Sequence, residues 1–195
     1  MADMTIARSE LILGGQKSGK TARAESLAAA WLARSPVHRA VYIATAQVWD
    51  EEMRERIARH QRDRAGRVPR MATVEAPLHV VQAISQHSRD SILIVVDCLT
   101  LWLTGQLMPV AAPEEGRAAA ATDSERDVIV AAALKACAGP LVLVSNEIGL
   151  GVIPLGREVR AFVDALGRLN QQAAAACERV TLMSAGLPLT LKGSA

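Results

Sequence analysis

The sequence has few aromatic residues: three Trp, one Tyr and one Phe make up 3% of its 195 residues. Proteins that read single-stranded nucleic acid usually stack bases on several aromatic side chains, so this scarcity argues against that class. The sequence also lacks an excess of charge, since 22 Lys and Arg stand against 20 Asp and Glu. Such a balance does not indicate a nucleic-acid or membrane partner. Half of the residues are hydrophobic, and the length suits one domain over residues 1–195 with an aliphatic core.

Clustered cysteines and long apolar runs are lacking too. Cys98, Cys137 and Cys177 lie far apart and form no CxxC pair, which argues against a zinc site and favours free thiols in a reducing compartment. No apolar run approaches the roughly 20 residues of a membrane span. Residues 1–10 contain acids and no apolar run, which is unlike a signal peptide. We therefore expect a cytoplasmic protein with no membrane span.

Short apolar runs alternate with stretches of helix-forming residues, which predicts an α/β fold with a mainly parallel central sheet. Strands are expected at residues 11–13, 40–44, 72–75, 91–96 and 141–144, and a C-terminal hairpin at 180–183 and 187–191. Helices are expected at 20–33, 50–64, 77–86, 99–107, 123–137 and 156–176. Pro77 suits the first turn of its helix. Residues 108–122 contain two prolines and an alanine run, so we expect a flexible loop there.

The most informative motif is GGQKSGKT at residues 14–21, which satisfies the pattern GxxxxGK[ST]. Its glycines let the backbone wrap around phosphate, Lys20 reaches the β- and γ-phosphates, and Thr21 places a hydroxyl on Mg²⁺. The N-terminus of the following helix points toward the anion. The alternative is a glycine-rich turn without a ligand, and the strand before and helix after the motif argue against it. The motif therefore predicts a site for a nucleoside triphosphate.

Asp97 follows the apolar run at 91–96. An acid at this place in a phosphate-binding sheet commonly holds magnesium through water, so we assign Mg²⁺ to Thr21 and Asp97. The alternative, compatible with the first, is that Asp97 caps the helix that begins at Leu99.

His60 lies in the charged helix predicted at 50–64, with Arg56 and Arg64 four residues away on either side. Nearby guanidinium groups disfavour the imidazolium form, so we expect a neutral and nucleophilic imidazole. The same arginines could bind phosphate oxygens, which makes His60 a candidate covalent nucleophile. On the residues alone, a surface histidine on a solvated helix is the stronger alternative.

A polar group follows the strand predicted at 141–144. Ser145, Asn146 and Glu147 stand at its carboxyl end, where ligands bind in such sheets. Asn170 and Gln171 on the long helix face either the same cleft or another subunit. Simple loop and helix-surface polarity explains these residues equally well.

Six segments of the chain together resemble a known family. They are GGQKSGKT at 14–21, YIATAQVWDEEMRERIARHQRDR at 42–64, VEAPL at 74–78, DCLTLWL at 97–103, SNEIGLGVIP at 145–154 and GRLNQ at 167–171. In this order they are similar to the bifunctional adenosylcobinamide kinase/adenosylcobinamide-phosphate guanylyltransferase family of cobalamin biosynthesis, over about residues 11–192. Very many proteins share the 14–21 motif, whereas the segments at 42–64 and 145–154 are far more specific.

The resemblance implies a RecA-like P-loop NTPase fold, a three-layer sandwich, in a homotrimer. It implies that ATP or GTP phosphorylates adenosylcobinamide, and that GMP then passes from GTP to adenosylcobinamide phosphate, giving adenosylcobinamide-GDP and pyrophosphate. The family's guanylylated histidine matches His60, and Lys20 is the second catalytic residue. Mg²⁺ is the implied cofactor. The matched nucleotide contacts are Gly14, Gly15, Gln16, Lys17, Ser18, Gly19, Lys20, Thr21, Ala44, Thr45, Ala46, Gln61, Arg62, Asp63, Arg64, Glu75 and Asp97.

The sequence departs from the family at several positions. Lys17 stands where the family often has Arg, Met71 and Ala72 where it often has Trp-Arg, and Val163 where it often has Arg. None of these touches Lys20, His60 or Asp97, so both activities are expected. Two other functions stay open: a monofunctional P-loop kinase in which His60 is idle, and a nucleotide-dependent switch or motor that binds protein or DNA.

Overall fold

The computed structural model describes residues 5–108 and 123–194. Its centre is a seven-stranded sheet in the order β3-β2-β4-β5-β1-β6-β7. Neighbouring strands run parallel except β6 and β7, which form the predicted C-terminal hairpin. The strands are β1 Ser9–Gly14, β2 Arg39–Ala44, β3 Met71–Glu75, β4 Ile92–Asp97, β5 Leu141–Val144, β6 Arg179–Ser184 and β7 Leu187–Lys192. The helices are α1 Lys20–Arg34, α2 Glu51–Arg67, α3 Val80–His87, α4 Leu99–Leu107, α5 Asp123–Ala136 and α6 Arg157–Ala176. The α/β prediction is therefore confirmed.

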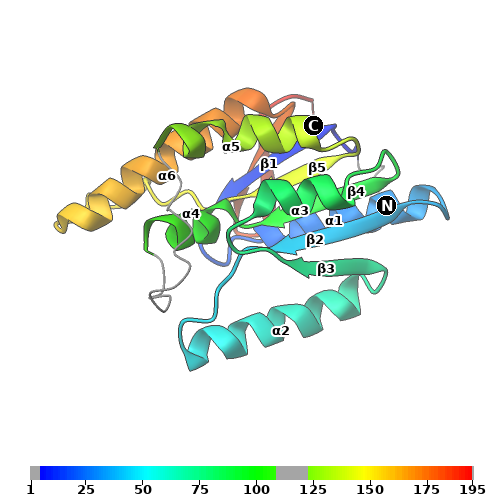
Figure 1. Cartoon of the computed structure of the whole chain (residues 1–195), viewed down its shortest axis with the longest axis horizontal. Coiled ribbons are helices and arrows are strands. Elements are labelled where there is room, and N and C mark those ends of the chain that lie inside the picture. The colour runs from blue at the N-terminus through cyan, green and yellow to red at the C-terminus, as the bar shows by residue number, and fades with distance from the viewer. Residues whose placement is uncertain (1–4, 109–122, 195) are drawn as a thin grey trace.

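Helices cover both faces of the sheet, and each face has its own aliphatic core (Figure 1). The side chains of Leu11, Val41 and Ile94 pack against the layer that contains α3, α4, α5 and α6. The neighbouring Ile12, Tyr42 and Val95 point to the opposite face and pack against α1. This alternation follows from the two-residue period of a strand, and burial on both faces explains the continuous apolar runs in the sequence.

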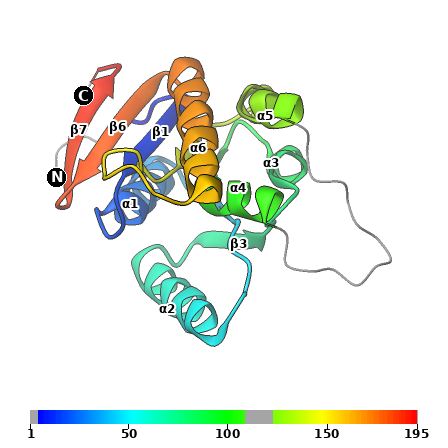
Figure 2. The same ribbon diagram turned by 90° about the vertical axis from the view of Figure 1, so that its left-hand side faces the viewer.

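Helix α2 lies outside the two helical layers, along the β3 edge of the sheet (Figure 2). Its N-cap is Asp50, whose carboxylate accepts a hydrogen bond of 2.7 Å from the backbone N–H of Met53. The helix continues past the predicted end at residue 64 as far as Arg67. The ion pair between Arg67 and Glu25 of α1 accounts for the extra turn, because it holds the last residue of α2 against the neighbouring helix.

The expected helix at 77–86 begins later, at Val80, with His79 as its N-cap. The prediction that Pro77 occupies the first turn is therefore wrong. The carbonyl oxygen of Leu78 instead accepts hydrogen bonds from the side chains of Trp102 and Gln106, so helix α4 holds this segment as an irregular bend before α3. The loop predicted at 108–122 lies outside the described residues except for Met108.

The three cysteines are buried free thiols, as expected. Burial raises the pKa of Cys98 to about 12 and that of Cys177 to about 11, so both stay protonated and unreactive near neutral pH. No helix within residues 5–108 and 123–194 is long and apolar enough to cross a membrane.

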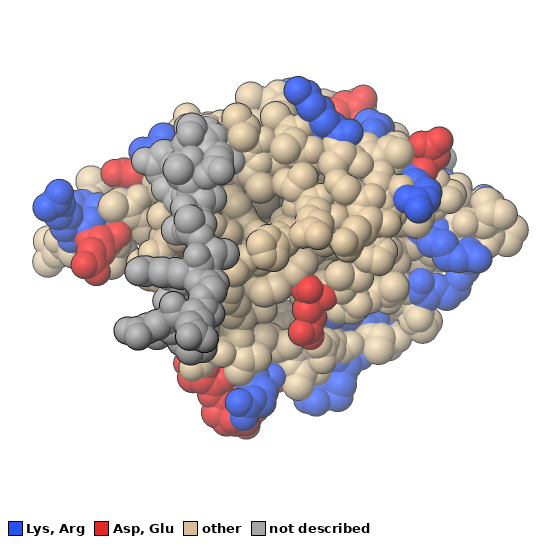
Figure 3. All heavy atoms as spheres, viewed as in Figure 1, with Lys and Arg blue, Asp and Glu red and all other residues tan. Residues whose placement is uncertain are grey.

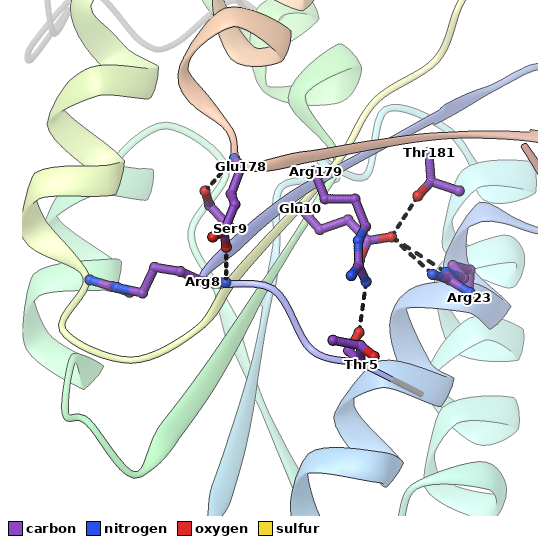
Figure 4. Close-up of polar contacts among 8 residues, drawn as sticks. All are labelled: Thr5, Arg8, Ser9, Glu10, Arg23, Glu178, Arg179 and Thr181. Carbon is purple, nitrogen blue, oxygen red and sulfur yellow. Dashed lines mark hydrogen bonds and ion pairs between the residues drawn. The ribbon is translucent and has the colours of Figure 1, made fainter. Parts of the chain in front are cut away.

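A buried ion cluster stabilises the start of β1 (Figure 4). Glu10 is 1% exposed and accepts hydrogen bonds from Thr181 at 2.8 Å, Arg23 at 3.3 Å and Arg179 at 3.4 Å. Arg179 also donates to the carbonyl oxygen of Thr5 at 2.7 Å. A charge this deeply buried is tolerated only when it is paired, so the cluster fixes β1 between its neighbours.

We expect Glu10→Ala to lower the free energy of unfolding by about 3–5 kcal/mol, because Arg179 would keep a buried charge without its carboxylate. Urea denaturation followed by circular dichroism measures the change. The matched control is Glu51→Ala, which removes an exposed pair with Arg54 and should cost less than about 1 kcal/mol. Equal losses in the two variants would show that the cluster has no special structural role.

Candidate functional site

The phosphate loop, residues 14–19, connects β1 to α1 with unusual backbone geometry. Gly14 has a φ of 148° and Gly19 a φ of 102°, and Lys17 also has a positive φ of 58°. A Cβ atom on Gly14 would lie 2.5 Å from the carbonyl oxygen of Met183 and 2.5 Å from Oγ of Ser18. Only glycine therefore fits at residue 14, as the motif requires.

Two other segments hold the phosphate loop in place. The backbone N–H of Glu147, in the β5–α6 loop, donates to the carbonyl oxygen of Gly14 at 3.1 Å. The backbone N–H of Gly186, in the β6–β7 turn, donates to the carbonyl oxygen of Ser18 at 3.0 Å. Helix α1 begins directly after the loop, and its first turn contains no acidic residue. The loop and the helix N-terminus together form a rigid cradle for an anion.

Lys20 is the first residue of α1, and its ammonium group is drawn into the loop. The residue is 8% exposed, and Nζ donates to the carbonyl oxygen of Gly15 at 2.6 Å. Burial lowers the pKa of Lys20, and Arg56 lowers it further, whereas Asp97 and Cys98 oppose the shift. A bound phosphate would supply the opposite charge that this buried ammonium favours.

Thr21 and Asp97 come together as the sequence predicts. The Thr21 hydroxyl donates to Oδ2 of Asp97 at 2.8 Å, and the Tyr42 hydroxyl donates to the same oxygen at 2.7 Å. A hydroxyl beside a carboxylate is a donor set that suits Mg²⁺, a cation that prefers oxygen ligands. The alternative role of Asp97 as a helix cap is wrong, because Cys98 caps α4 with its sulfur atom.

Tyr42 is the functional side chain that the sequence did not reveal. Burial raises its pKa well above the ordinary value, and the Asp97 carboxylate adds to the shift, so the phenol stays protonated and donates. Ala44 pairs with Asp97 across β2 and β4, which places Tyr42 diagonally opposite on the same face. The proximity of Tyr42 to Asp97 therefore follows from the register of β2 and β4 and has no local signal in the sequence.

His60 lies on helix α2, between Arg56 and Arg64. His60 is half-buried, and burial is the largest cause that lowers its pKa; Arg56 and Arg59 lower it further, whereas Asp97 and Asp63 oppose them. The expected neutral imidazole is thus supported, although burial outweighs the arginines as its cause. Asp97 and Lys20 are thus coupled electrostatically to α2, through His60 and Arg56 respectively.

Two of the predicted nucleotide contacts, Arg64 and Thr45, have side chains that contact other parts of the protein. Arg64 is 4% exposed; its guanidinium stacks 3.8 Å from the centre of the Tyr42 ring and donates to Oγ1 of Thr73 at 3.1 Å. Thr45 is fully buried, and its hydroxyl both donates to and accepts from the backbone of Cys98 at 2.7 Å. The stacking of Arg64 on Tyr42 anchors α2 to β2, and β2 pairs with β4, the strand that ends at Asp97.

The other predicted nucleotide contacts lie at the carboxyl ends of β2 and β3, on the phosphate loop and on α2. Gln61 donates to the Glu75 carboxylate at 3.4 Å, beside a cavity of about 260 Å³ whose polar lining includes Glu75, His79, Gln82 and Gln86. Ala44 and Ala46 flank Thr45 where β2 ends, Gln16 and Lys17 are exposed on the phosphate loop, and Arg62 and Asp63 are exposed on α2. Figure 3 shows that the visible face around α3 is largely uncharged apart from an acidic side chain near its centre, with both basic and acidic side chains at its margins.

The polar residues after β5 form a network with α4 and α6. Asn146 donates to the Thr100 hydroxyl through its backbone N–H at 2.9 Å and its side chain at 3.1 Å. Asn170 of α6 is buried and donates to the carbonyl oxygen of Asn146 at 3.0 Å. Asn170 therefore faces this loop, whereas Gln171 is exposed.

Comparison with known proteins gives a consistent result. Residues 10–191 match the family model described as cobinamide kinase/cobinamide phosphate guanyltransferase. The chain is 45% identical to the bifunctional adenosylcobalamin biosynthesis protein CobP of Pseudomonas aeruginosa, over 94% of this chain and 97% of that protein. It is 35% and 34% identical to the bifunctional adenosylcobalamin biosynthesis proteins CobU of Salmonella typhimurium and Escherichia coli, over 93% of this chain and 98% of each.

Among solved structures, the flagellar accessory protein FlaH of Methanocaldococcus jannaschii superposes with a TM-score of 0.49 at 12% identity. The superposition covers 97% of this chain and 80% of that one.

Proposed function

Because the chain belongs to the cobinamide kinase/cobinamide phosphate guanyltransferase family, we propose that it performs both reactions in the family's description. It phosphorylates adenosylcobinamide with ATP or GTP, and then transfers GMP from GTP to adenosylcobinamide phosphate. The products of the second step are adenosylcobinamide-GDP and pyrophosphate. The observation that supports this proposal most directly is the phosphate loop itself, with the Lys20 ammonium bonded inside it and Thr21 bonded to Asp97.

In the kinase step the phosphate loop and Lys20 bind the triphosphate and stabilise the charge that moves with the γ-phosphoryl group. The substrate hydroxyl attacks the γ-phosphorus, its proton is released, and the bond to the β-phosphate oxygen breaks. Thr21 and Asp97 would hold Mg²⁺, which would neutralise charge on the phosphates. Tyr42 fixes the Asp97 carboxylate through its 2.7 Å hydrogen bond and so orients this acid.

In the guanylyl step the neutral imidazole of His60 attacks the α-phosphorus of GTP. A P–N bond forms, the P–O bond to pyrophosphate breaks, and the imidazole loses its proton. An oxygen of adenosylcobinamide phosphate then attacks the same phosphorus, the P–N bond breaks, and the imidazole takes up a proton and returns to its neutral form. Arg56 is the arginine that we assign to the developing negative charge, because Arg64 is committed to Tyr42 and Thr73.

The test of this function is to incubate the protein with adenosylcobinamide, GTP and Mg²⁺ and to identify the corrinoid products by mass spectrometry. Formation of adenosylcobinamide-GDP with release of pyrophosphate supports both activities. Arrest at adenosylcobinamide phosphate would instead indicate a monofunctional kinase. Nucleotide-dependent binding of a protein or DNA without any corrinoid product would indicate a switch or motor.

Glu75 and Gln61 are the groups that we assign to the guanine base, since they lie together beside the cavity at the end of β3. A carboxylate can accept two hydrogen bonds from the N1–H and the amino group of guanine, and adenine does not offer this pair. The pair would give the guanylyl step its choice of GTP.

We expect Glu75→Gln to raise the KM for GTP in the guanylyl step about 10- to 100-fold, which corresponds to the loss of a charged hydrogen bond of about 1.5–3 kcal/mol. The KM for ATP in the kinase step should change little. The control is Glu52→Gln, at an exposed acid in the first turn of α2. A parallel rise of both KM values would show that Glu75 does not read the base.

Homotrimeric assembly is implied by the resemblance, and a cytoplasmic location is expected from the sequence; both remain proposals. Sedimentation equilibrium would measure the mass of the assembly against the 20.7 kDa of one chain.

A further inference from the structure

The loop between β5 and α6 exposes several aliphatic side chains, separated only by glycine and proline. Leu150 is 80% exposed, Val152 97%, Ile153 77% and Leu155 98%. Residues 148–156 contain no Lys, Arg, Asp or Glu. Isolated apolar residues are common on protein surfaces, but several exposed aliphatic side chains in one segment mark a surface that binds a ligand or another protein.

This apolar loop is directly connected to the phosphate loop. Its first residues follow Glu147, whose backbone N–H donates to the carbonyl oxygen of Gly14 at 3.1 Å. On the other side, the β6–β7 turn bonds to Ser18 through Gly186, and the next residue, Leu187, is 71% exposed. The first turns of α6, which follow the apolar loop, project beyond the sheet (Figure 1). We call residues 148–155 together with Leu187 the apolar rim.

The phosphate loop therefore has a basic neighbour and an apolar neighbour. Seven arginines lie between residues 54 and 70, in α2 and just after it, and Arg56 acts electrostatically on Lys20. The apolar rim adjoins the phosphate loop through different segments, β5–α6 and β6–β7. A triphosphate is attracted to the basic side, whereas the uncharged rim is suited to a large ligand with extensive apolar surface.

We propose that the apolar rim binds the corrinoid macrocycle of the substrate. This inference rests on the proposed function, which requires a corrinoid hydroxyl to reach the γ-phosphate. A corrinoid is a wide ring with methyl groups on its faces and amides at its edge, so it gains most from aliphatic contacts. Because the hydroxyl is tethered to the ring, the ring must lie on a surface continuous with the phosphate loop, and the apolar rim meets that condition.

The test compares the double variant Leu150→Ser, Val152→Ser with the wild-type protein. We expect the KM for adenosylcobinamide in the kinase step, and its dissociation constant in equilibrium dialysis, to rise about tenfold or more, since two aliphatic contacts are lost. Val37→Ser is the matched control: Val37 is 65% exposed, in the turn before β2 at the opposite end of the strands. Its corrinoid KM should stay at the wild-type value.

Labelling of His60 by GTP needs no corrinoid and serves as the check that each variant is folded with an intact nucleotide site. An unchanged corrinoid KM in the double variant would overturn the proposal. A smaller assembly in sedimentation velocity, with corrinoid affinity retained, would also overturn it, because the apolar rim would then join copies of the chain. Wild-type protein that binds corrinoid in dialysis but does not phosphorylate it would contradict the proposed function and leave the apolar rim supported.

Discussion

His60→Ala is expected to abolish covalent attachment of GMP and to leave phosphorylation of adenosylcobinamide within about twofold of wild type. The imidazole is the only group assigned to the P–N bond, whereas the kinase step uses the phosphate loop, Lys20 and the Asp97 site. Incubation with GTP labelled at the α-phosphate, followed by denaturation, measures the adduct. A phosphoramidate is stable to base and labile to acid, which distinguishes it from an ester.

His87→Ala, at the last residue of α3, is the matched control and should label normally. The pH profile gives a second readout of the same prediction. The folded-state pKa of His60 is lowered from 6.5, so the neutral nucleophile predominates at pH 7 and above. The labelling rate should therefore be flat there and fall only as the pH drops below 6.5. Normal labelling of the alanine variant would place the nucleophile elsewhere.

Lys20→Ala is expected to impair both steps, with a loss of about 10²–10³-fold or more in the kinase rate. The ammonium is held in the loop by the carbonyl oxygen of Gly15 at 2.6 Å, where it would meet the β- and γ-phosphates. If both steps use one triphosphate site, as we propose, His60 labelling should fall as well. Transfer of labelled γ-phosphate to the corrinoid and labelling by α-phosphate measure the two steps separately.

The control is Lys135→Ala, at an exposed lysine near the end of α5, where both rates should stay at the wild-type level. Phosphorylation that survives in Lys20→Ala would refute the phosphate-site assignment. Loss of the kinase step with normal labelling of His60 would show that the two reactions use separate nucleotide sites.

The strands could be predicted because a parallel sheet buries both faces of each strand. Leu93, Ile94, Val95 and Val96 are completely buried, and this is visible in the sequence as one apolar run. The start of α3 could not be predicted, because the turn before it is fixed by Trp102 and Gln106 from a later helix. Contacts between segments that are distant in the sequence produce no local residue pattern, so a helix boundary that depends on them cannot be predicted from the sequence.

The same division applies to the candidate site. The phosphate loop is a local motif, so Gly14 to Thr21 were predictable from eight consecutive letters. The role of Tyr42 depends on the register between β2 and β4, and that of Arg64 depends on where α2 packs. Arg64 was predicted to contact nucleotide because it stands beside His60 in a similar sequence, whereas the structure places its guanidinium over an aromatic ring.

The position of β1 in the sheet also constrains when the site can form during synthesis. The phosphate loop follows β1, yet β1 pairs with β5 and β6, which are synthesised more than a hundred residues later. The loop is then completed by hydrogen bonds from Glu147 and Gly186. A nascent chain that has been synthesised only as far as α4 contains the whole phosphate-loop motif, but it lacks β5, β6 and the residues that bond to the loop. We therefore expect nucleotide to bind weakly until β5 and the β6–β7 hairpin have joined the sheet.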